Sequence, residues 1–226
     1  MSEADNPDAL DEASVRRAFD RAAAHYERAD ALQREVADEL LERLACVRVT
    51  PRRIVDLGCG TGYALGQLQH MYRRAEVFGI DFAPAMAAQA RAGRRLRRRP
   101  LGICADVRRT PLPDHSVDVV LSNLTLQWIS DPRVFFTEVR RILRPEGVLM
   151  FSTFGPDTLA ELRQAWAAVD HEVHINTFLD MHDIGDAALA AGLSEPVMDV
   201  DRWRRAYPDV RALMRSIKAM GAHNAT

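Results

Sequence analysis

The stretch Arg53-Ile54-Val55-Asp56-Leu57-Gly58-Cys59-Gly60-Thr61-Gly62 decides the fold. Its first five residues predict a short buried strand, and the amphipathic stretch from Tyr63 to Met71 predicts a helix directly after the glycines. Glycines let a ligand approach bare backbone, and the N-terminus of the helix offers free N–H groups. A tight strand-to-helix turn would need one glycine rather than three. The segment therefore predicts a binding loop for a nucleotide-type ligand.

The spacing of the glycines narrows the ligand class. A dinucleotide-binding loop requires a further glycine three positions after the second one, and that position is Tyr63. The loop instead reads Gly-x-Gly-x-Gly, with Asp56 two residues before Gly58. S-adenosylmethionine (SAM) has no pyrophosphate to hold, but it carries an ammonium group that an acid at a strand end can orient. The loop therefore favours SAM, with Asp56, Gly58, Cys59, Gly60 and Gly62 as binding residues.

Outside this loop, strands and helices alternate along the chain. Further strands are predicted at 75–80, 101–105, 117–121 and 148–153, with helices at 84–96 and 132–143 between them. Such alternation is typical of a mostly parallel sheet covered on both faces, as in the Rossmann-like α/β class. Amphipathic helices are predicted upstream, at 13–45. Downstream we expect helices at 157–170, 180–191 and 208–220 and a sixth strand at 197–203.

Acids stand where the second and third strands end. Asp81 follows about twenty residues after the loop, where a carboxylate accepts both hydroxyls of a ribose, although it could equally cap the next helix. Asp106 could accept from the adenine amino group, with Val107 supplying a backbone N–H, or be a turn residue. Phe82 follows Asp81 and is included with the cofactor residues. Open α/β sheets bind ligands at this edge.

The fourth strand ends at Ser122-Asn123-Leu124, where the methyl acceptor should lie. Ser122 is assigned to the cofactor. An Asn/Asp-Pro-Pro-aromatic motif, typical of enzymes that methylate adenine or glutamine amino groups, is absent here, which argues against a nucleic-acid amine as acceptor. Gln127 and Trp128 either line the pocket or, in the case of Trp128, pack in the core.

The composition indicates one ordinary globular domain. The 226 residues have a net charge of −2, no apolar run near the roughly 20 residues of a membrane span, and three cysteines without metal-ligand spacing. We expect a cytoplasmic protein with no metal, nucleic-acid or membrane partner. The expected organisation is a disordered stretch at 1–12 and a single domain at 13–226, made of a helical cap at 13–49, a SAM-binding core at 50–155 and substrate-side helices with the sixth strand at 156–226.

Taken together, the glycine loop, Asp81 and Asp106 resemble class I SAM-dependent methyltransferases. More narrowly, the chain resembles the malonyl-[acyl-carrier protein] O-methyltransferases of biotin synthesis over roughly residues 14–226. Segments outside the cofactor motifs carry this narrower resemblance: 19–26, 121–124 with Gln127-Trp128, 151–154, 165–170, 174–178 and 218–223.

The resemblance implies methylation of the free carboxylate of a malonyl thioester on acyl-carrier protein, or on coenzyme A. It also implies that the N-terminal helices lie over the cofactor, which makes Tyr26 the candidate catalytic residue and Gln33 a further positioning residue. Packing of Tyr26 between helix and sheet is the alternative. Two basic patches are candidates for carrier docking: the arginines at 91–99, which could also be a solvated helix end, and Arg202, Arg204, Arg205, Arg211, Arg215 and Lys218.

The chain departs from the family in one respect. Class I sheets have a seventh, antiparallel strand, and none can be placed before Thr226. The sequence therefore predicts an unpaired edge on the strand at 148–153. Two other functions stay open: methylation of another small molecule such as a quinone ring, which would need a base beside the methyl group, and SAM binding without catalysis.

Overall fold

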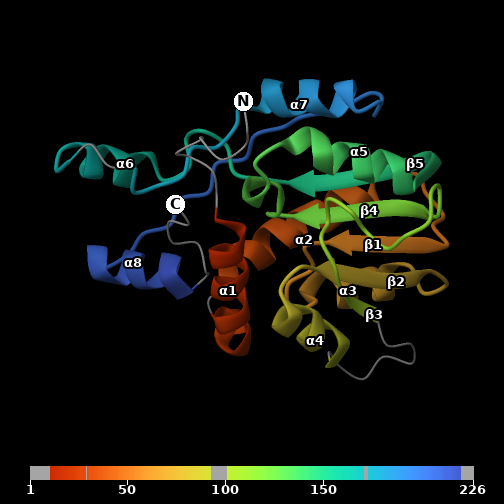
Figure 1. Ribbon diagram of the computed structural model, residues 1–226, viewed down its shortest axis with the longest axis horizontal. Coiled ribbons are helices and arrows are strands. Elements are labelled where there is room, and N and C mark those ends of the chain that lie inside the picture. The colour runs from red at the N-terminus through yellow and green to blue at the C-terminus, as the bar shows by residue number, and fades with distance from the viewer. Residues whose placement is uncertain (1–10, 29, 93–100, 171–172, 220–226) are drawn as a thin grey trace.

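A parallel sheet forms the centre of the protein (Figure 1). The computed structural model describes residues 11–28, 30–92, 101–170 and 173–219. Within these residues the sheet has five strands in the order β3-β2-β1-β4-β5, and every neighbouring pair is parallel. The strands are β1 (Arg53–Leu57), β2 (Glu76–Asp81), β3 (Leu101–Cys104), β4 (Val117–Asn123) and β5 (Leu143–Ser152). The predicted Rossmann-like α/β class is confirmed.

Helices cover both faces of the sheet. Leu40, Leu44, Leu65 and Leu68 of α2 and α3 pack on one face, whereas Phe135, Phe136 and Ile142 of α5 and Ile184 of α7 pack on the other. Because successive side chains of a strand alternate, Val119 and Leu121 of β4 join the first cluster and Val120 joins the second. The helices are α1 (Glu12–Ala22), α2 (Ala31–Ala45), α3 (Tyr63–Met71), α4 (Pro84–Ala92), α5 (Pro132–Ile142), α6 (Ala160–Ala167), α7 (Met181–Ala190) and α8 (Val210–Ala219), with 3-10 turns at Ala23–Arg28 and Leu126–Trp128.

The N-terminal helices are fastened to the sheet domain by polar contacts. Asp20 of α1 accepts a hydrogen bond of 2.9 Å from the backbone N–H of Ala85, in the first turn of α4. On α2, Asp38 accepts from the hydroxyl of Tyr63 at 2.9 Å, next to the glycine loop. Asp11 caps α1, so the helix begins at Glu12, inside the stretch expected to be disordered. The rest of that stretch lies outside the described residues.

The prediction of a sixth strand at 197–203 is wrong. These residues form no regular secondary structure and pair with no strand of the sheet. Ion pairs hold the segment against α2 instead, since Arg43 contacts Asp199 at 2.8 Å and Asp201 at 2.7 Å. Val197 is 93% exposed, so the apolar side chains that suggested a strand are not buried on a sheet face. β5 is therefore an outer strand of the described sheet, and one of its edges is unpaired there, as the sequence predicts.

Candidate active site

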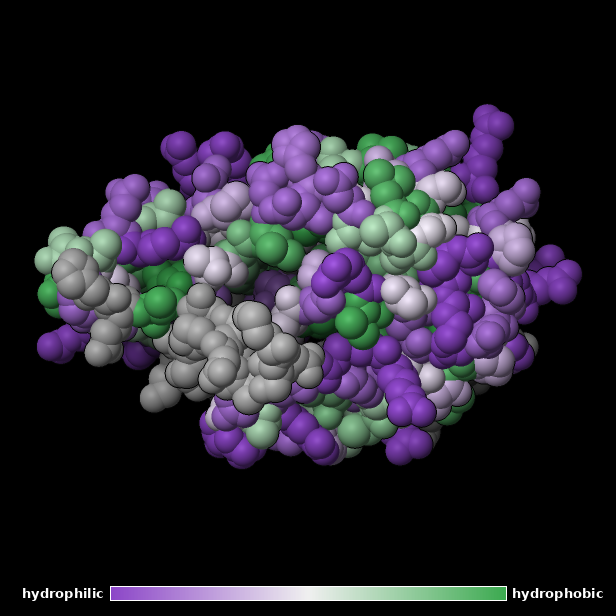
Figure 2. Space-filling view, turned by 45° about the horizontal axis from the view of Figure 1, so that its top comes forward, coloured by the Kyte–Doolittle hydropathy of each residue, from purple (hydrophilic) through white to green (hydrophobic). Residues whose placement is uncertain are grey.

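The carboxyl ends of the strands open into a cleft of about 2180 Å³. In Figure 1 the arrowheads point toward α1, α6 and α8, which stand around this edge. Figure 2 shows hydrophobic residues around a hollow in a mostly hydrophilic face. Pockets for one small molecule are typically about 300–1,000 Å³. The cleft therefore has room for a cofactor and a second, larger molecule.

The glycine loop follows the carboxyl end of β1 and lines the cleft there. Gly58, Gly60 and Gly62 have φ values of 78°, 53° and 91°, a region that L side chains rarely adopt. A Cβ on Gly58 would lie 2.0 Å from Oγ1 of Thr125, whereas a Cβ on Gly60 would meet only Cε1 of Tyr26, at 3.8 Å. The backbone at Gly60 is therefore open to a ligand, while the backbone at Gly58 is closely packed.

Asp81 connects the glycine loop to the end of β2. Its Oδ2 accepts from the N–H of Gly60 and its Oδ1 from the N–H of Ala83, both at 2.9 Å. Burial raises the pKa of Asp81 to about 6, against the lowering effect of these two bonds. The structure is therefore compatible with both interpretations of Asp81. Its carboxylate accepts a hydrogen bond from the turn before α4, as a helix cap would, and it lies in the cleft, where it could accept from a ribose.

Asp56 is the most desolvated acid of the cleft. It is 2% exposed, and its Oδ1 has no hydrogen-bond partner within the described residues. Burial, together with the charge of Asp81, raises the pKa of Asp56 to about 7. A buried carboxyl without a partner is costly. A cation in the cleft would stabilise the ionised carboxylate, and the ammonium group of SAM is such a cation.

Asp106 is held by an arginine that the sequence did not single out. Arg108 donates to Oδ2 of Asp106 at 2.6 Å and to Glu12 of α1. Burial opposes ionisation of Asp106, but the bonds from Arg108 prevail and lower its pKa. Asp106 and Val107 both line the cleft. The Glu12–Arg108–Asp106 chain thus ties the N-terminal cap to this end of the site.

Aromatic side chains cover the cofactor end. Tyr26 and Phe19 lie 6.4 Å apart between ring centroids, Phe19 and Phe82 lie 6.2 Å apart, and Phe19 meets the edge of Trp128 at 5.3 Å. Burial and the charges of Asp30 and Asp81 raise the pKa of the Tyr26 phenol above its usual value. The phenol is therefore neutral at pH 7 and unsuited to act as a base.

Two predicted binding residues do not reach the cleft. Ser122 is 1% exposed, and its hydroxyl donates to the carbonyl of Leu57 at 2.9 Å, bridging β4 and β1. Gly62 is the N-cap of α3 and packs against the backbone of Ala90. Their sequence positions mark tight packing below the site. The other predicted residues, Tyr26, Gln33, Asp56, Gly58, Cys59, Gly60, Asp81, Phe82, Asp106 and Val107, all line the cleft.

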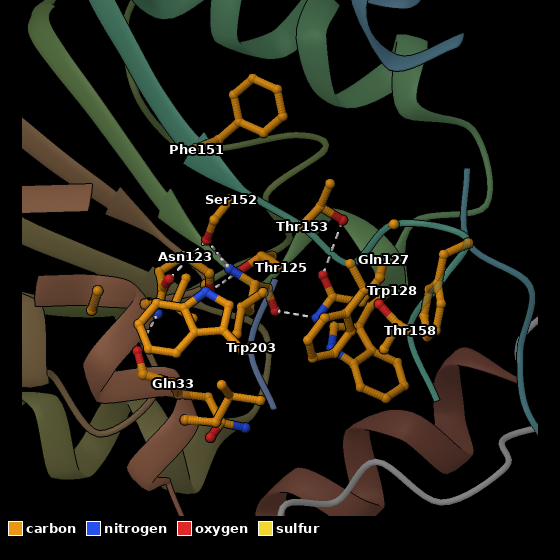
Figure 3. Close-up of a pocket in the computed structure, with 18 of the residues that line it drawn as sticks. Gln33, Asn123, Thr125, Gln127, Trp128, Phe151, Ser152, Thr153, Thr158 and Trp203 are labelled. Carbon is orange, nitrogen blue, oxygen red and sulfur yellow. Dashed lines mark hydrogen bonds between the residues drawn. The ribbon is translucent and has the colours of Figure 1, made fainter. Parts of the chain in front are cut away.

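A polar network occupies the ends of β4 and β5 (Figure 3). The Ser152 hydroxyl donates to Oδ1 of Asn123 at 2.8 Å, and the Thr153 hydroxyl donates to Oε1 of Gln127 at 3.2 Å. Nδ2 of Asn123 donates to the carbonyl of Gln33 on α2 at 2.9 Å. Leu124, between the two amides, has a φ of 49°, a strained value for leucine. The sequence pointed to Asn123 and Gln127, but not to the hydroxyls that orient them.

The residues of the cofactor end fit SAM. The open backbone at Gly60, the unpartnered buried oxygen of Asp56 and the strand-end carboxylate of Asp81 offer a cradle for a cationic amino-acid moiety and a ribose. No cluster of His, Cys, Asp and Glu in the described part of the chain has the geometry of a metal site. No helix among the described residues is long and apolar enough to cross a membrane.

Comparison with known proteins agrees with this fold. A model of the methyltransferase domain matches residues 55–151. Structures of a methyltransferase from Haloferax volcanii bound to the Trm112 activator and of a SAM-dependent methyltransferase from Thermotoga maritima have TM-scores of 0.65 and 0.59. Each is 24% identical to this chain. The match with the Haloferax protein covers 90% of this chain and 93% of that protein. The match with the Thermotoga protein covers 79% of this chain and 81% of that protein. These neighbours show the fold.

Closer relatives show the family. Malonyl-[acyl-carrier protein] O-methyltransferases of Laribacter hongkongensis and Halorhodospira halophila are each 49% identical over 96% of this chain, covering 75% and 73% of their own lengths. The narrow resemblance seen in the sequence is thereby confirmed. The chain is a SAM-dependent methyltransferase and belongs to the malonyl-[acyl-carrier protein] O-methyltransferase family.

Proposed function

We propose that this enzyme transfers the methyl group of SAM to the free carboxylate of a malonyl thioester carried by acyl-carrier protein. The observation that carries the proposal is 49% identity to enzymes of that name over 96% of the chain. The resulting methyl ester masks a charge, which lets fatty-acid synthesis enzymes elongate the chain toward pimelate in biotin synthesis.

The acceptor end suits a nucleophile that needs no base. A malonyl carboxyl group has a pKa near 4, like those of Asp and Glu, so it is ionised at pH 7. The polar groups at the ends of β4 and β5 are amides and hydroxyls. His174 lines the cleft, but it is bonded to Asp170 at 2.8 Å and stacked on Trp166. A quinone-ring acceptor, which usually requires a base, has less support from this arrangement.

The methyl transfer requires no proton to be added or removed. SAM, when bound, supplies a methyl group on a sulfonium; a carboxylate oxygen forms the new O–C bond, the S–C bond breaks, and its electron pair stays on sulfur. Because this step removes opposite charges, a water-poor pocket favours it. The aromatic cover of Phe19, Tyr26, Phe82 and Trp128 supplies such surroundings, and the protein mainly aligns the two reactants.

We assign the cofactor to the glycine-loop half of the cleft. Asp81 accepts from the ribose hydroxyls, Asp56 faces the ammonium group, and Asp106 with Val107 lies at the adenine. Tyr26 and Gln33 stand over the reacting groups from the cap. Support comes from the common location of these residues in one cleft and from the open backbone at Gly60.

The test is mass spectrometry of malonyl-carrier incubated with SAM and the protein. The expected product gains one methyl group, whereas acetyl-carrier, which lacks the free carboxylate, stays unchanged. Turnover of acetyl-carrier would contradict the assignment of the nucleophile. SAM binding measured by calorimetry, without turnover of any carboxylate, would identify a binding module without catalysis.

A further inference from the structure

Two side-chain amides at the acceptor end each keep one N–H that no described group uses. Ser152 and Thr153 donate to the amide oxygens of Asn123 and Gln127, which fixes the direction of both amides. Nδ2 of Asn123 then donates to the carbonyl of Gln33, and Nε2 of Gln127 donates to the carbonyl of Leu124 at 2.7 Å. A primary amide nitrogen has two hydrogens, so each amide has one left.

Both amides line the same cleft (Figure 3). Gln33 stands there too, and its Oε1 is buried without a partner among the described residues. Rotation of that amide by 180° exchanges its oxygen and nitrogen, so that it can also present an N–H. The acceptor end thus offers donors in a place where buried polar groups normally have partners.

Most of the arginines that line the cleft form ion pairs with acidic side chains of the protein. Arg34 pairs with Asp30, Arg43 with Asp199 and Asp201, and Arg108 with Asp106 and Glu12. Arg202 and Arg205 pair with Asp157 and Glu35. Among the described lining residues, Arg204 and Arg215 are the arginines without such a pair, and both are exposed.

We propose that the spare N–H groups of Asn123 and Gln127 bind the carboxylate of the acceptor and determine specificity for a free acid. This inference rests on the proposed function, whose nucleophile is that carboxylate. Neutral amides suit the task because a guanidinium would bind both oxygens tightly and place a second positive charge beside the sulfonium. An amide N–H orients the carboxylate and leaves a lone pair free for attack.

Ser152 and Thr153 act as positioning residues. Without their hydroxyls, the amides of Asn123 and Gln127 could rotate and present oxygen to the carboxylate. Ser152 ends β5 and Thr153 follows it, so both amides are held near the carboxyl end of this strand, in the lining of the cleft. The strained backbone of Leu124 belongs to the same arrangement, since its N–H donates to Ser152 and its carbonyl accepts from Gln127.

The test compares the binding of malonyl-carrier and acetyl-carrier by calorimetry, in the wild type and in Asn123→Asp and Gln127→Glu. These substitutions keep the shape of the side chain, remove the N–H donors and add a negative charge. We expect the dissociation constant of malonyl-carrier to rise about 10- to 100-fold. That of acetyl-carrier should change less than about 2-fold, because both acyl groups share the carrier contacts. Thr153→Val should give a smaller loss for malonyl-carrier alone.

The matched control is Gln164→Glu, on an exposed position of α6 outside the cleft lining. It adds the same charge and should leave both dissociation constants unchanged. SAM affinity and the unfolding midpoint report whether each variant is folded. Asn123→Leu and Gln127→Met, which remove the donors without adding charge, replace the variant at the same position if it is not.

Unchanged malonyl-carrier binding in folded Asn123 and Gln127 variants would overturn the inference. An equal loss for acetyl-carrier would do so too, because the amides would then not recognise the carboxylate. Methylation of malonyl-carrier by the wild type is measured in the same series. If the wild type methylates but the variants bind normally, the proposed function stands and this inference alone fails.

Discussion

The two halves of the cleft are built differently. The cofactor half, at the carboxyl ends of β1 to β3, is built around the backbone of Gly58 and Gly60, which line the cleft and have positive φ, and the carboxylate of Asp81, which is bonded to nearby backbone N–H groups. The acceptor half, beyond β4 and β5, is made of side chains from β4, β5, α2 and the segment after α7. Local backbone geometry can be reused for one cofactor across a fold, whereas side chains gathered from distant segments can change with the acceptor.

Hydrogen exchange should show the largest contrast, which lies between the sheet and the segment after α7 that lines the acceptor half. Amides of β4 at 117–121 lie in the parallel ladder, whereas residues 197–203 have no strand partner. Exchange of ladder amides requires opening of the core, so we expect 197–203 to exchange faster by a factor of about 10³ or more. Equal protection of the two segments would restore the sixth strand and remove the contrast.

The same contrast explains what the sequence could predict. The succession of β1 to β5 along the chain, the covering helices and the strand-end positions of Asp56, Asp81 and Asp106 follow from local patterns, because apolar periodicity and glycine spacing act within a few residues. The pairing of Arg43 with Asp199 and Asp201 spans more than 150 residues. No local pattern contains such a contact, and the apolar residues at 197–203 therefore suggested a strand that does not form.

The site residues show the same difference between local patterns and contacts that join distant parts of the chain. Asp81 and Gly60 could be proposed from spacing alone, whereas Arg108 could not, because its contact with Glu12 spans 96 residues. The direction of the Ser122 side chain could not be predicted for a related reason: a strand-end position does not tell whether a side chain points into the cleft or toward the neighbouring strand.

Gly58→Ala should be the most destabilising single change in the cofactor half. The new Cβ would lie 2.0 Å from Thr125, and the φ of 78° is unfavourable for alanine. Strain and overpacking together should lower the free energy of unfolding by about 2–4 kcal/mol, measured by denaturant titration. Gly66→Ala on α3, where an added Cβ meets nothing within 4 Å, is the control and should be neutral or stabilising by up to about 1 kcal/mol. Equal stability of both variants would mean that the loop is not closely packed.

Asp81→Ala should weaken SAM binding by about 1–3 kcal/mol in calorimetry, because two hydroxyls of the cofactor and the N–H of Gly60 lose an acceptor. Asp118→Ala is the matched control. Asp118 also accepts from two backbone N–H groups, those of Arg52 and Arg53, but near the amino ends of β1 and β4. It should affect stability and leave SAM affinity unchanged. Unaltered affinity in Asp81→Ala would remove this residue from the ribose.

The raised pKa of Asp56 predicts a pH effect confined to the cofactor half. The folded pKa is about 7 against 3.8 unfolded, so the folded state binds more protons between these values and loses stability as pH rises through about 7. Asp56→Asn stays neutral. The difference in unfolding temperature between this variant and the wild type should therefore grow from pH 5.5 to pH 8 without cofactor. SAM, a cation, should bind the wild type more tightly as pH rises over the same range. Parallel curves for the two proteins would contradict a buried, protonated Asp56.

Carrier docking should show the smallest effect, and it belongs to the acceptor half. Of the arginines after residue 200, Arg204, Arg211 and Arg215 are exposed and have no ion pair among the described residues, beside the partly exposed Trp203 and Met214. A charge-reversed Arg211→Glu, Arg215→Glu double variant should raise the KM for malonyl-carrier about 3- to 10-fold at low salt and leave kcat unchanged, because rim charges act mainly on association.

Added salt should reduce that difference, since exposed charges are screened. Arg74→Glu, an exposed position just before β2, at the opposite edge of the sheet, is the control and should leave the KM unchanged. The competing patch at Arg94 and Arg95 follows α4 in the sequence and lies outside the described residues. If charge reversal at Arg94 and Arg95 abolished carrier methylation while the α8 variant behaved as wild type, the carrier would not dock on α8. The division of the cleft into a reused half and a substrate-specific half would then not extend to the protein surface.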